Sequence, residues 1–126
     1  MAASAAIFPI PAVAQVVNAR VIVVGGGFGG AACARALKRA NPRLSVTLVE
    51  TNRTFTACPL SNAAIAGLRE LKLQDFGYDH VAAAGVGMEF GAATAIDPAA
   101  KNVTLADGRK LGYERLVLAP GIDFRW

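Results

Sequence analysis

The feature that most constrains the fold is a glycine-rich turn between a β-branched run and a helical segment. Residues 21–24 read Val-Ile-Val-Val, a continuous apolar run typical of a parallel strand buried on both faces. Gly25, Gly27 and Gly30 follow with the spacing G-x-G-x-x-G. The first glycine of this motif permits a tight turn, the second lets a pyrophosphate approach the backbone, and the third lets the helix pack closely on the strand. The pattern therefore predicts strand, turn and helix over residues 21–40.

A second apolar run, residues 46–49, ends at Glu50, twenty residues after Gly30. A carboxylate at this place accepts hydrogen bonds from the ribose of an adenosine, while the preceding helix points free N–H groups at the phosphates. Glycine-rich turns are common, but here strand, glycines, helix, strand and acid follow in the expected order. We predict dinucleotide binding through Gly25, Gly27, Gly30 and Glu50. The acid favours FAD or NAD over NADP, and the motif does not separate the first two.

Composition excludes several classes of protein. The sequence has 126 residues, the size of one domain, and 54% of them are hydrophobic, which argues against disorder. No apolar stretch is long enough to span a membrane as a helix. The net charge of +4 comes from dispersed Lys and Arg without interleaved aromatics, so we expect a solvated surface and no nucleic-acid partner. His80 is the only histidine, and we expect no metal site.

The two ends of the sequence carry separate expectations. Residues 2–10 are small and mostly apolar, and the Ala-Val-Ala at 12–14 resembles a signal-peptide cleavage site, although no Lys or Arg precedes Arg20. Residues 1–18 are either the remnant of a secretory signal, which predicts a periplasmic protein, or a flexible tail of a cytoplasmic one. Because the sequence stops directly after a strand and a turn, we expect residues 19–126 to be the N-terminal part of a larger nucleotide-binding domain.

The stretch after Glu50 predicts short elements. Residues 51–62 read as irregular, and residues 63–73 as a short helix interrupted by Gly67. Residues 76–85 read as another short helical segment, with its closing glycine in a left-handed cap. Together these segments are expected to form a connecting region.

The last third of the sequence predicts a small antiparallel meander and a return strand. Residues 86–96 read as one strand with a bulge at Gly91. The Asp-Gly at 107–108 is a strong signal for a two-residue hairpin within residues 102–111. Residues 115–119 are apolar enough for a buried last strand. The predicted fold class is α/β, a Rossmann-like β-α-β unit followed by this meander and incomplete at the C-terminus.

Two further segments are more specific than the glycine motif: residues 58–62 (Cys-Pro-Leu-Ser-Asn) and residues 119–122 (Ala-Pro-Gly-Ile). Matching segments also occur at residues 46–50 (Val-Thr-Leu-Val-Glu), 77–79 (Gly-Tyr-Asp) and 95–98 (Ala-Ile-Asp-Pro). Together with the glycine motif, these segments resemble the flavoprotein subunits of flavocytochrome c sulfide dehydrogenases. That family lies within the superfamily of FAD- and NAD(P)-binding pyridine nucleotide-disulfide oxidoreductases. The resemblance covers residues 20–126.

The resemblance implies an FAD-binding domain in an oxidoreductase that oxidises sulfide and passes electrons to a c-type cytochrome subunit. In that family the cysteine matching Cys58 forms a thioether with the 8α-methyl group of the flavin. A lone cysteine in a loop is also often only a small hydrophobe, so covalent attachment stays one of two interpretations. The Ala-x-Gly-like turn that ends the last strand adds Gly121 to the predicted cofactor-binding residues. Cys33 is expected to pack in the core without pairing to Cys58.

By the same resemblance, the working redox disulfide and the second nucleotide-like domain belong to segments beyond Trp126. No catalytic residue is therefore predicted among these residues, and alone they are expected to be inactive. Three alternatives stay open: a sulfide:quinone reductase or single-subunit NADH dehydrogenase of the same superfamily, a non-catalytic module that binds a nucleotide or a haem protein, or a piece that does not fold alone.

Overall fold

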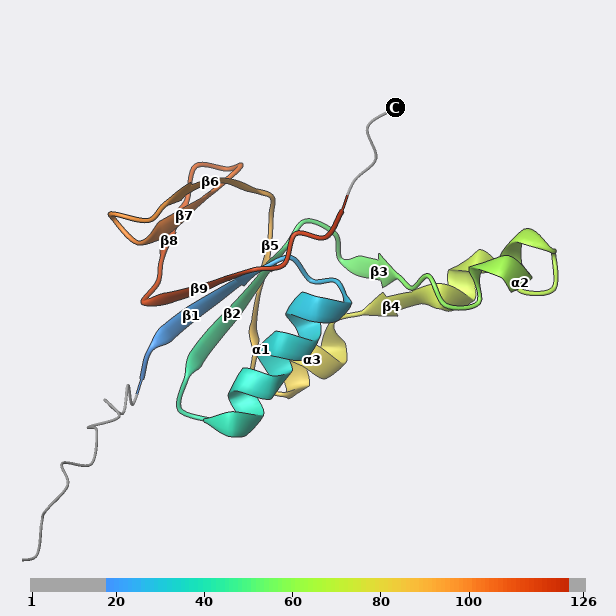
Figure 1. Ribbon diagram of the computed structural model, residues 1–126, viewed down its shortest axis with the longest axis horizontal. Coiled ribbons are helices and arrows are strands. Elements are labelled where there is room, and N and C mark those ends of the chain that lie inside the picture. The colour runs from blue at the N-terminus through green and yellow to red at the C-terminus, as the bar shows by residue number, and fades with distance from the viewer. Residues whose placement is uncertain (1–17, 123–126) are drawn as a thin grey trace, which may run out of the picture.

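The computed structural model describes residues 18–122, in which a four-stranded parallel sheet has helices on one face and a small meander on the other (Figure 1). The sheet order is β5-β2-β1-β9, and all three pairings are parallel. The predicted α/β, Rossmann-like class is confirmed. The signal or tail predicted for residues 1–18 lies almost entirely outside the described residues, as do residues 123–126. The strands of the sheet are β1 (Arg20–Val24), β2 (Ser45–Glu50), β5 (Gly87–Phe90) and β9 (Arg115–Leu118).

Helix α1 (Phe28–Ala40) connects β1 to β2 and packs on one face of the sheet. Its Ala34 is completely buried against alternate residues of both strands. The helix ends where Asn41 N–H donates to the carbonyl of Leu37 at 2.9 Å, directly before Pro42. Lys38 Nζ donates to the carbonyl oxygens of Pro42 and Leu44 at 2.7 and 2.9 Å, which holds the turn into β2.

The alternation of side chains along β1 and β2 gives the sheet two buried faces. Val21, Val23 and Leu48 face α1 and a second helix, α3 (Asp79–Ala83). Ile22 and Val49 face the meander instead. β9 is an edge strand, and its residues are half-buried or exposed, so the prediction of a buried last strand was wrong. Its sequence is as apolar as a central strand, but only one of its sides has a neighbouring strand.

Residues 86–96 do not form one bulged strand, as the sequence had indicated. β5 ends at Phe90, Gly91 N–H donates to the carbonyl of Glu50 at 2.9 Å, and β6 (Ala93–Asp97) begins a separate sheet. The irregular pairing lies between Ala93 and Ala95, not at Gly91. The glycine therefore marks a change of sheet, because β5 pairs with β2 while β6 pairs with β7.

The meander has the order β6-β7-β8, with β7 (Asn102–Leu105) and β8 (Lys110–Gly112) forming the predicted hairpin. Its loop has three residues, not two, because Leu105 N–H donates to the carbonyl of Arg109 at 2.8 Å. Gly108 N–H donates to the carbonyl of Leu105 at 2.9 Å, and Gly108 has a φ of +85°. A three-residue loop with glycine in the left-handed region is a common way to close a hairpin.

Residues 51–77 form an arm that projects away from the sheet in Figure 1. We call it the Cys58 arm. Its stem is a two-stranded antiparallel pair, β3 (Thr54–Thr56) with β4 (Asp75–Gly77), which replaces the irregular stretch and the helix start predicted there. The predicted helix over residues 63–73 is split into α2 (Ser61–Ile65) and the 3₁₀-helix η1 (Leu71–Gln74).

Candidate functional site

Two glycines of the motif are required by backbone packing. Gly25 has a φ of +99°, and a Cβ placed on it would overlap the carbonyl oxygen of Ala119. A Cβ on Gly30 would overlap the carbonyl oxygen of Gly25. The turn after β1, the start of α1 and the end of β9 therefore meet main chain against main chain. Both glycines have the packing roles that the motif predicts for its first and third positions.

The second glycine of the motif is not crowded by the protein. Gly27 is the N-cap residue of α1, where no side chain caps the helix. A Cβ on Gly27 would meet only Phe55, at an ordinary 3.7 Å, and one on Gly29 would meet nothing within 4 Å. The first turn of a 13-residue helix is thus left open to a ligand. Free N–H groups and the positive end of the helix dipole suit a phosphate at this place.

Glu50 is directly beside the glycine turn. Its Oε2 accepts a hydrogen bond from Gly26 N–H at 2.6 Å, and its Oε1 accepts one from Asn52 N–H at 2.9 Å. Each carboxylate oxygen can accept more than one hydrogen bond, so acceptor positions remain for a ligand. The structure therefore brings the predicted acid to the predicted turn at the carboxyl end of β2.

Sequence reasoning missed two residues of this site, Gly26 and Tyr78. The Tyr78 hydroxyl donates to the carbonyl of Gly26 at 3.1 Å, and a Cβ on Gly26 would lie 2.7 Å from that hydroxyl and 3.0 Å from Glu50 Cγ. The extra glycine between Gly25 and Gly27 was the available signal. The pKa of Tyr78 is raised by burial and, to a smaller extent, by the charge of Glu50.

A cavity of about 200 Å³ lies at the carboxyl ends of β1 and β2, where open α/β sheets bind their ligands. Gly25, Glu50 and Pro120 line it, so the turn, the acid and the neighbour of Gly121 are together. Gly121 follows with a φ of +80° and open space around it. Residues 91–93, at the change of sheet, form the other wall, and nothing in the sequence had marked them as part of the site.

Another cavity, of about 240 Å³, lies between α1, α3 and the stem of the Cys58 arm. Phe28 and Phe55 line it and meet edge to face, with ring centroids 4.9 Å apart. Its walls are mostly apolar and include no carboxylate. Gly26 and Gly27, at the helix N-terminus that suits a pyrophosphate, also line this cavity, whereas the cavity beside Glu50 has the carboxylate that suits a ribose.

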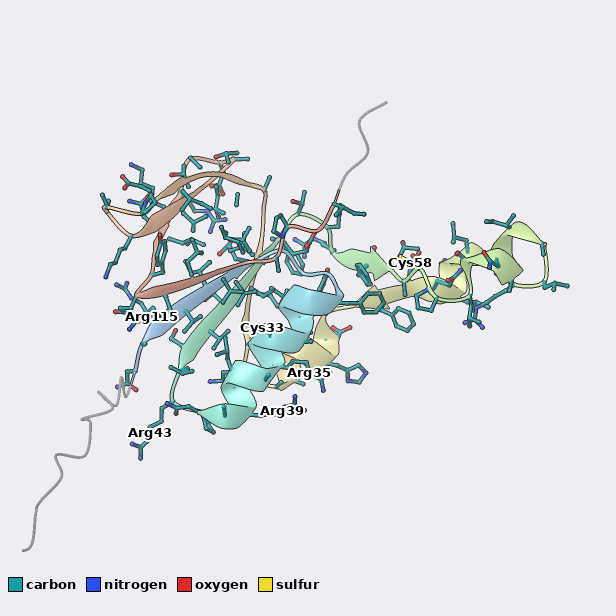
Figure 2. The ribbon with its side chains drawn as sticks, in the orientation of Figure 1. Cys33, Arg35, Arg39, Arg43, Cys58 and Arg115 are labelled. Carbon is teal, nitrogen blue, oxygen red and sulfur yellow. The ribbon has the colours of Figure 1, made fainter. Side chains whose placement is uncertain are left out.

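Cys58 is exposed on its arm and does not line the cavity beside Glu50. Figure 2 shows it well apart from Cys33, which is half-buried on α1. Both thiols are free, as expected from the sequence. The labelled arginines of α1, Arg35 and Arg39, are exposed, which agrees with a solvated basic face (Figure 2).

No group of three or more His, Cys, Asp or Glu side chains within residues 18–122 is arranged to hold a metal ion. None of the helices in the range is both long and apolar enough to cross a membrane.

Comparison with known proteins gives consistent results. The family model for pyridine nucleotide-disulphide oxidoreductases matches residues 19–125. The flavoprotein chain of the flavocytochrome c sulfide dehydrogenase from Chlorobaculum thiosulfatiphilum is 59% identical over 44 residues, 35% of this chain and 92% of that sequence. The sulfide-quinone reductase of Aquifex aeolicus is 35% identical over 107 residues, 80% of this chain and 24% of that protein.

Among solved structures, the sulfide:quinone oxidoreductase from Aquifex aeolicus matches 86% of this chain with a TM-score of 0.80 and 29% identity. The match covers 25% of that structure. The chain thus spans about a quarter of the length of the sulfide-quinone reductase.

Proposed function

The chain belongs to the pyridine nucleotide-disulphide oxidoreductase family, and from that premise we propose that it is the FAD-binding part of a sulfide-oxidising flavoprotein. The observation that carries FAD binding is the Glu50 carboxylate, held 2.6 Å from Gly26 N–H beside an uncapped helix N-terminus. The choice of sulfide is supported by the similarity to the sulfide dehydrogenase flavoprotein chain and to sulfide-quinone reductase.

Different residues of the site would contact different parts of the cofactor. Gly25 and Gly30 shape the turn, and Gly27 leaves the N–H groups of α1 open to the pyrophosphate. Glu50 would accept hydrogen bonds from the hydroxyl groups of the adenosine ribose, and Gly121 directly follows Pro120, which lines the same cavity. A bound flavin would accept two electrons at once and release them singly, which suits a two-electron donor and a one-electron haem acceptor.

Cys58 is the proposed point of covalent attachment, through a thioether between its Sγ and the 8α carbon of the flavin. Formation of this bond removes one hydrogen from the thiol and one from the methyl group. Both hydrogens, with their two electrons, would go to the flavin ring, so attachment would need no outside oxidant. The exposure of Cys58 supports this role, because a reacting thiol must be accessible.

The proposed electron acceptor is a c-type cytochrome subunit, which would place the protein in the periplasm. Similarity to a flavocytochrome c flavoprotein chain supports this acceptor. A quinone is the second candidate, supported by the match of 86% of the chain to a sulfide:quinone oxidoreductase structure.

The first test is the mass of the denatured full-length protein. Wild-type protein should be heavier by one FAD, the Cys58→Ser variant should lose that increment, and a Cys33→Ser control should keep it. An unmodified mass with a dissociable yellow cofactor would argue against attachment and favour the quinone-reductase relatives. Protein without any flavin would contradict the FAD proposal itself.

The second test separates the two acceptors. The flavin of the purified protein would be reduced with sulfide and mixed rapidly with either oxidised cytochrome c or a soluble quinone. Faster reoxidation by the cytochrome would support the flavocytochrome proposal, and faster reoxidation by the quinone would support the alternative. A flavin that sulfide does not reduce would contradict the proposed substrate.

A further inference from the structure

One buried polar side chain, that of Gln74, lies within hydrogen-bonding distance of the loop that carries Cys58. Gln74, the last residue of η1, is 2% exposed and is the only buried polar residue within residues 18–122. With the amide oriented so that its nitrogen can donate, that nitrogen lies 2.8 Å from the carbonyl oxygen of Ala57 and 2.6 Å from that of Pro59. These carbonyl groups belong to the residues directly before and after Cys58.

Main-chain hydrogen bonds also hold this loop. Ala57 is buried, and its N–H donates to the carbonyl of Gln74 at 2.9 Å. On the other side, Ser61 N–H donates to the carbonyl of Cys58 at 3.0 Å. The thiol-bearing residue itself is exposed. Cys58 is thus an exposed residue of a loop in which the residues before and after it both lie within hydrogen-bonding distance of Gln74.

We propose that Gln74 is a positioning residue that holds the Cys58 loop in the shape needed for flavin attachment. This inference rests on the proposed attachment at Cys58. A primary amide has two N–H donors, and here two carbonyl oxygens lie within reach of it. Holding two reacting groups in a productive geometry raises the rate of bond formation, whereas a loop free to move loses that gain.

The test uses Gln74→Met in the full-length protein, because methionine keeps the length of the side chain but has no donor. Flavin-free protein would be mixed with FAD, and the denatured mass followed over time. We expect the initial rate of covalent attachment to fall about tenfold or more, the effect of losing two hydrogen bonds of ordinary strength. Non-covalent FAD binding should change less than about twofold, because Gln74 is not among the residues that line the cavity beside Glu50.

A matched control comes from the stem of the same arm. Thr56 Oγ1 donates to Asp75 Oδ1 at 2.6 Å, an exposed bond that does not involve the carbonyl groups on either side of Cys58. Thr56→Val should attach flavin within about twofold of the wild-type rate. Hydrogen exchange in residues 57–62 should be faster in Gln74→Met than in either the control or the wild type.

Each outcome decides the proposal. A Gln74→Met variant that attaches FAD at the wild-type rate overturns it, while the proposed function would stand. A wild type that gains no FAD mass would overturn the proposed attachment first, and this inference with it. A second variant, Gln74→Glu, keeps the side-chain length but replaces the amide donor. If neither variant keeps the wild-type circular dichroism spectrum and non-covalent FAD binding, Gln74 is a folding residue and the proposal is wrong.

Discussion

The glycine turn and the Cys58 arm differ in what holds them. At the turn, Gly25 and Gly30 meet backbone atoms so closely that a methyl group would not fit. On the arm, residues between the two strands of the stem are largely exposed, and Gln74 is the one buried side chain among residues 58–77. The glycine turn is therefore fixed by main-chain packing, whereas the loop of Cys58 depends on a few polar contacts.

The difference has a functional consequence under the proposed function. A phosphate-binding turn works through backbone N–H groups, so its shape must not vary. A thiol that forms a bond with a bound cofactor needs both access and a defined approach. The arm projects from the sheet, which leaves the thiol accessible (Figure 1). Gln74 holds the loop of Cys58, which defines the direction from which the thiol approaches. Substitutions in the two regions should therefore have very different costs.

The largest effect is expected for Gly30→Ala. The added Cβ would overlap the carbonyl oxygen of Gly25, and neither backbone can move without disrupting β1 or α1. We expect a loss of more than about 4 kcal/mol in the free energy of unfolding, measured by urea denaturation, together with loss of FAD binding.

The neighbouring glycine is the control for this prediction. A Cβ on Gly29 would meet nothing within 4 Å, and Gly29 is also in α1. Gly29→Ala should therefore be neutral or stabilising by up to about 1 kcal/mol, since alanine is the better helix former. Equal costs at the two positions would contradict the packing described for the turn.

The next largest effect is expected for Glu50→Gln. The variant loses the charge in the hydrogen bonds to Gly26 N–H and Asn52 N–H, and one carboxylate oxygen becomes an amide donor. We expect a loss of about 2 kcal/mol in the free energy of unfolding and FAD binding weakened about tenfold or more. Glu70→Gln, an exposed acid of the arm, should change stability by less than about 0.5 kcal/mol. A similar loss in both variants would show that Glu50 has no special role.

A smaller effect is expected for Tyr78→Phe, which removes the 3.1 Å hydrogen bond to the carbonyl of Gly26. We expect a loss of about 1 kcal/mol in the free energy of unfolding at neutral pH. Tyr113 is also buried, and its hydroxyl makes no hydrogen bond within residues 18–122. Tyr113→Phe should therefore cost less than Tyr78→Phe, and the reverse order would contradict the assignment.

The same tyrosine should produce a pH dependence. Burial and the nearby Glu50 raise the pKa of Tyr78 in the folded state. The unfolded chain loses this proton near pH 10, while the folded protein retains it to higher pH. Above about pH 10 the unfolded state therefore binds fewer protons, and stability falls as the pH rises. The free energy of unfolding, measured from about pH 8 to 11, should fall more steeply with pH for the wild type than for Tyr78→Phe. The same pH dependence in both proteins would contradict the raised pKa of Tyr78.

The smallest effect on stability is expected for Cys58→Ser. The side chain is exposed, and only its main-chain carbonyl is in a hydrogen bond. Flavin-free wild type and variant should unfold within about 0.5 kcal/mol of each other. A loss above about 1 kcal/mol would mean that the thiol packs into the arm, and the contrast between turn and arm would weaken.

The regions also differ in how well the sequence predicted them. The strand, turn, helix and second strand around Gly25, Gly30 and Glu50 appear in the structure as expected, because each signal is local and the elements are consecutive. The stem of the arm was missed because Thr56 pairs with Asp75, and neither three-residue strand has a visible period. The sequence indicated an interruption at Gly91, but it could not show that the residues before and after this glycine join different sheets.

By itself, the sequence determined the β-α-β unit, the glycines that its turn requires and the acid that follows it. These features depend on hydrophobic periodicity and backbone freedom within about 30 residues. Only the tertiary structure decided that Tyr78 closes over Gly26, and that Gln74 holds the loop of Cys58. Tyr78 and Gly26 are 52 positions apart, and a hydrogen bond between distant residues leaves no periodic trace in the sequence of either partner.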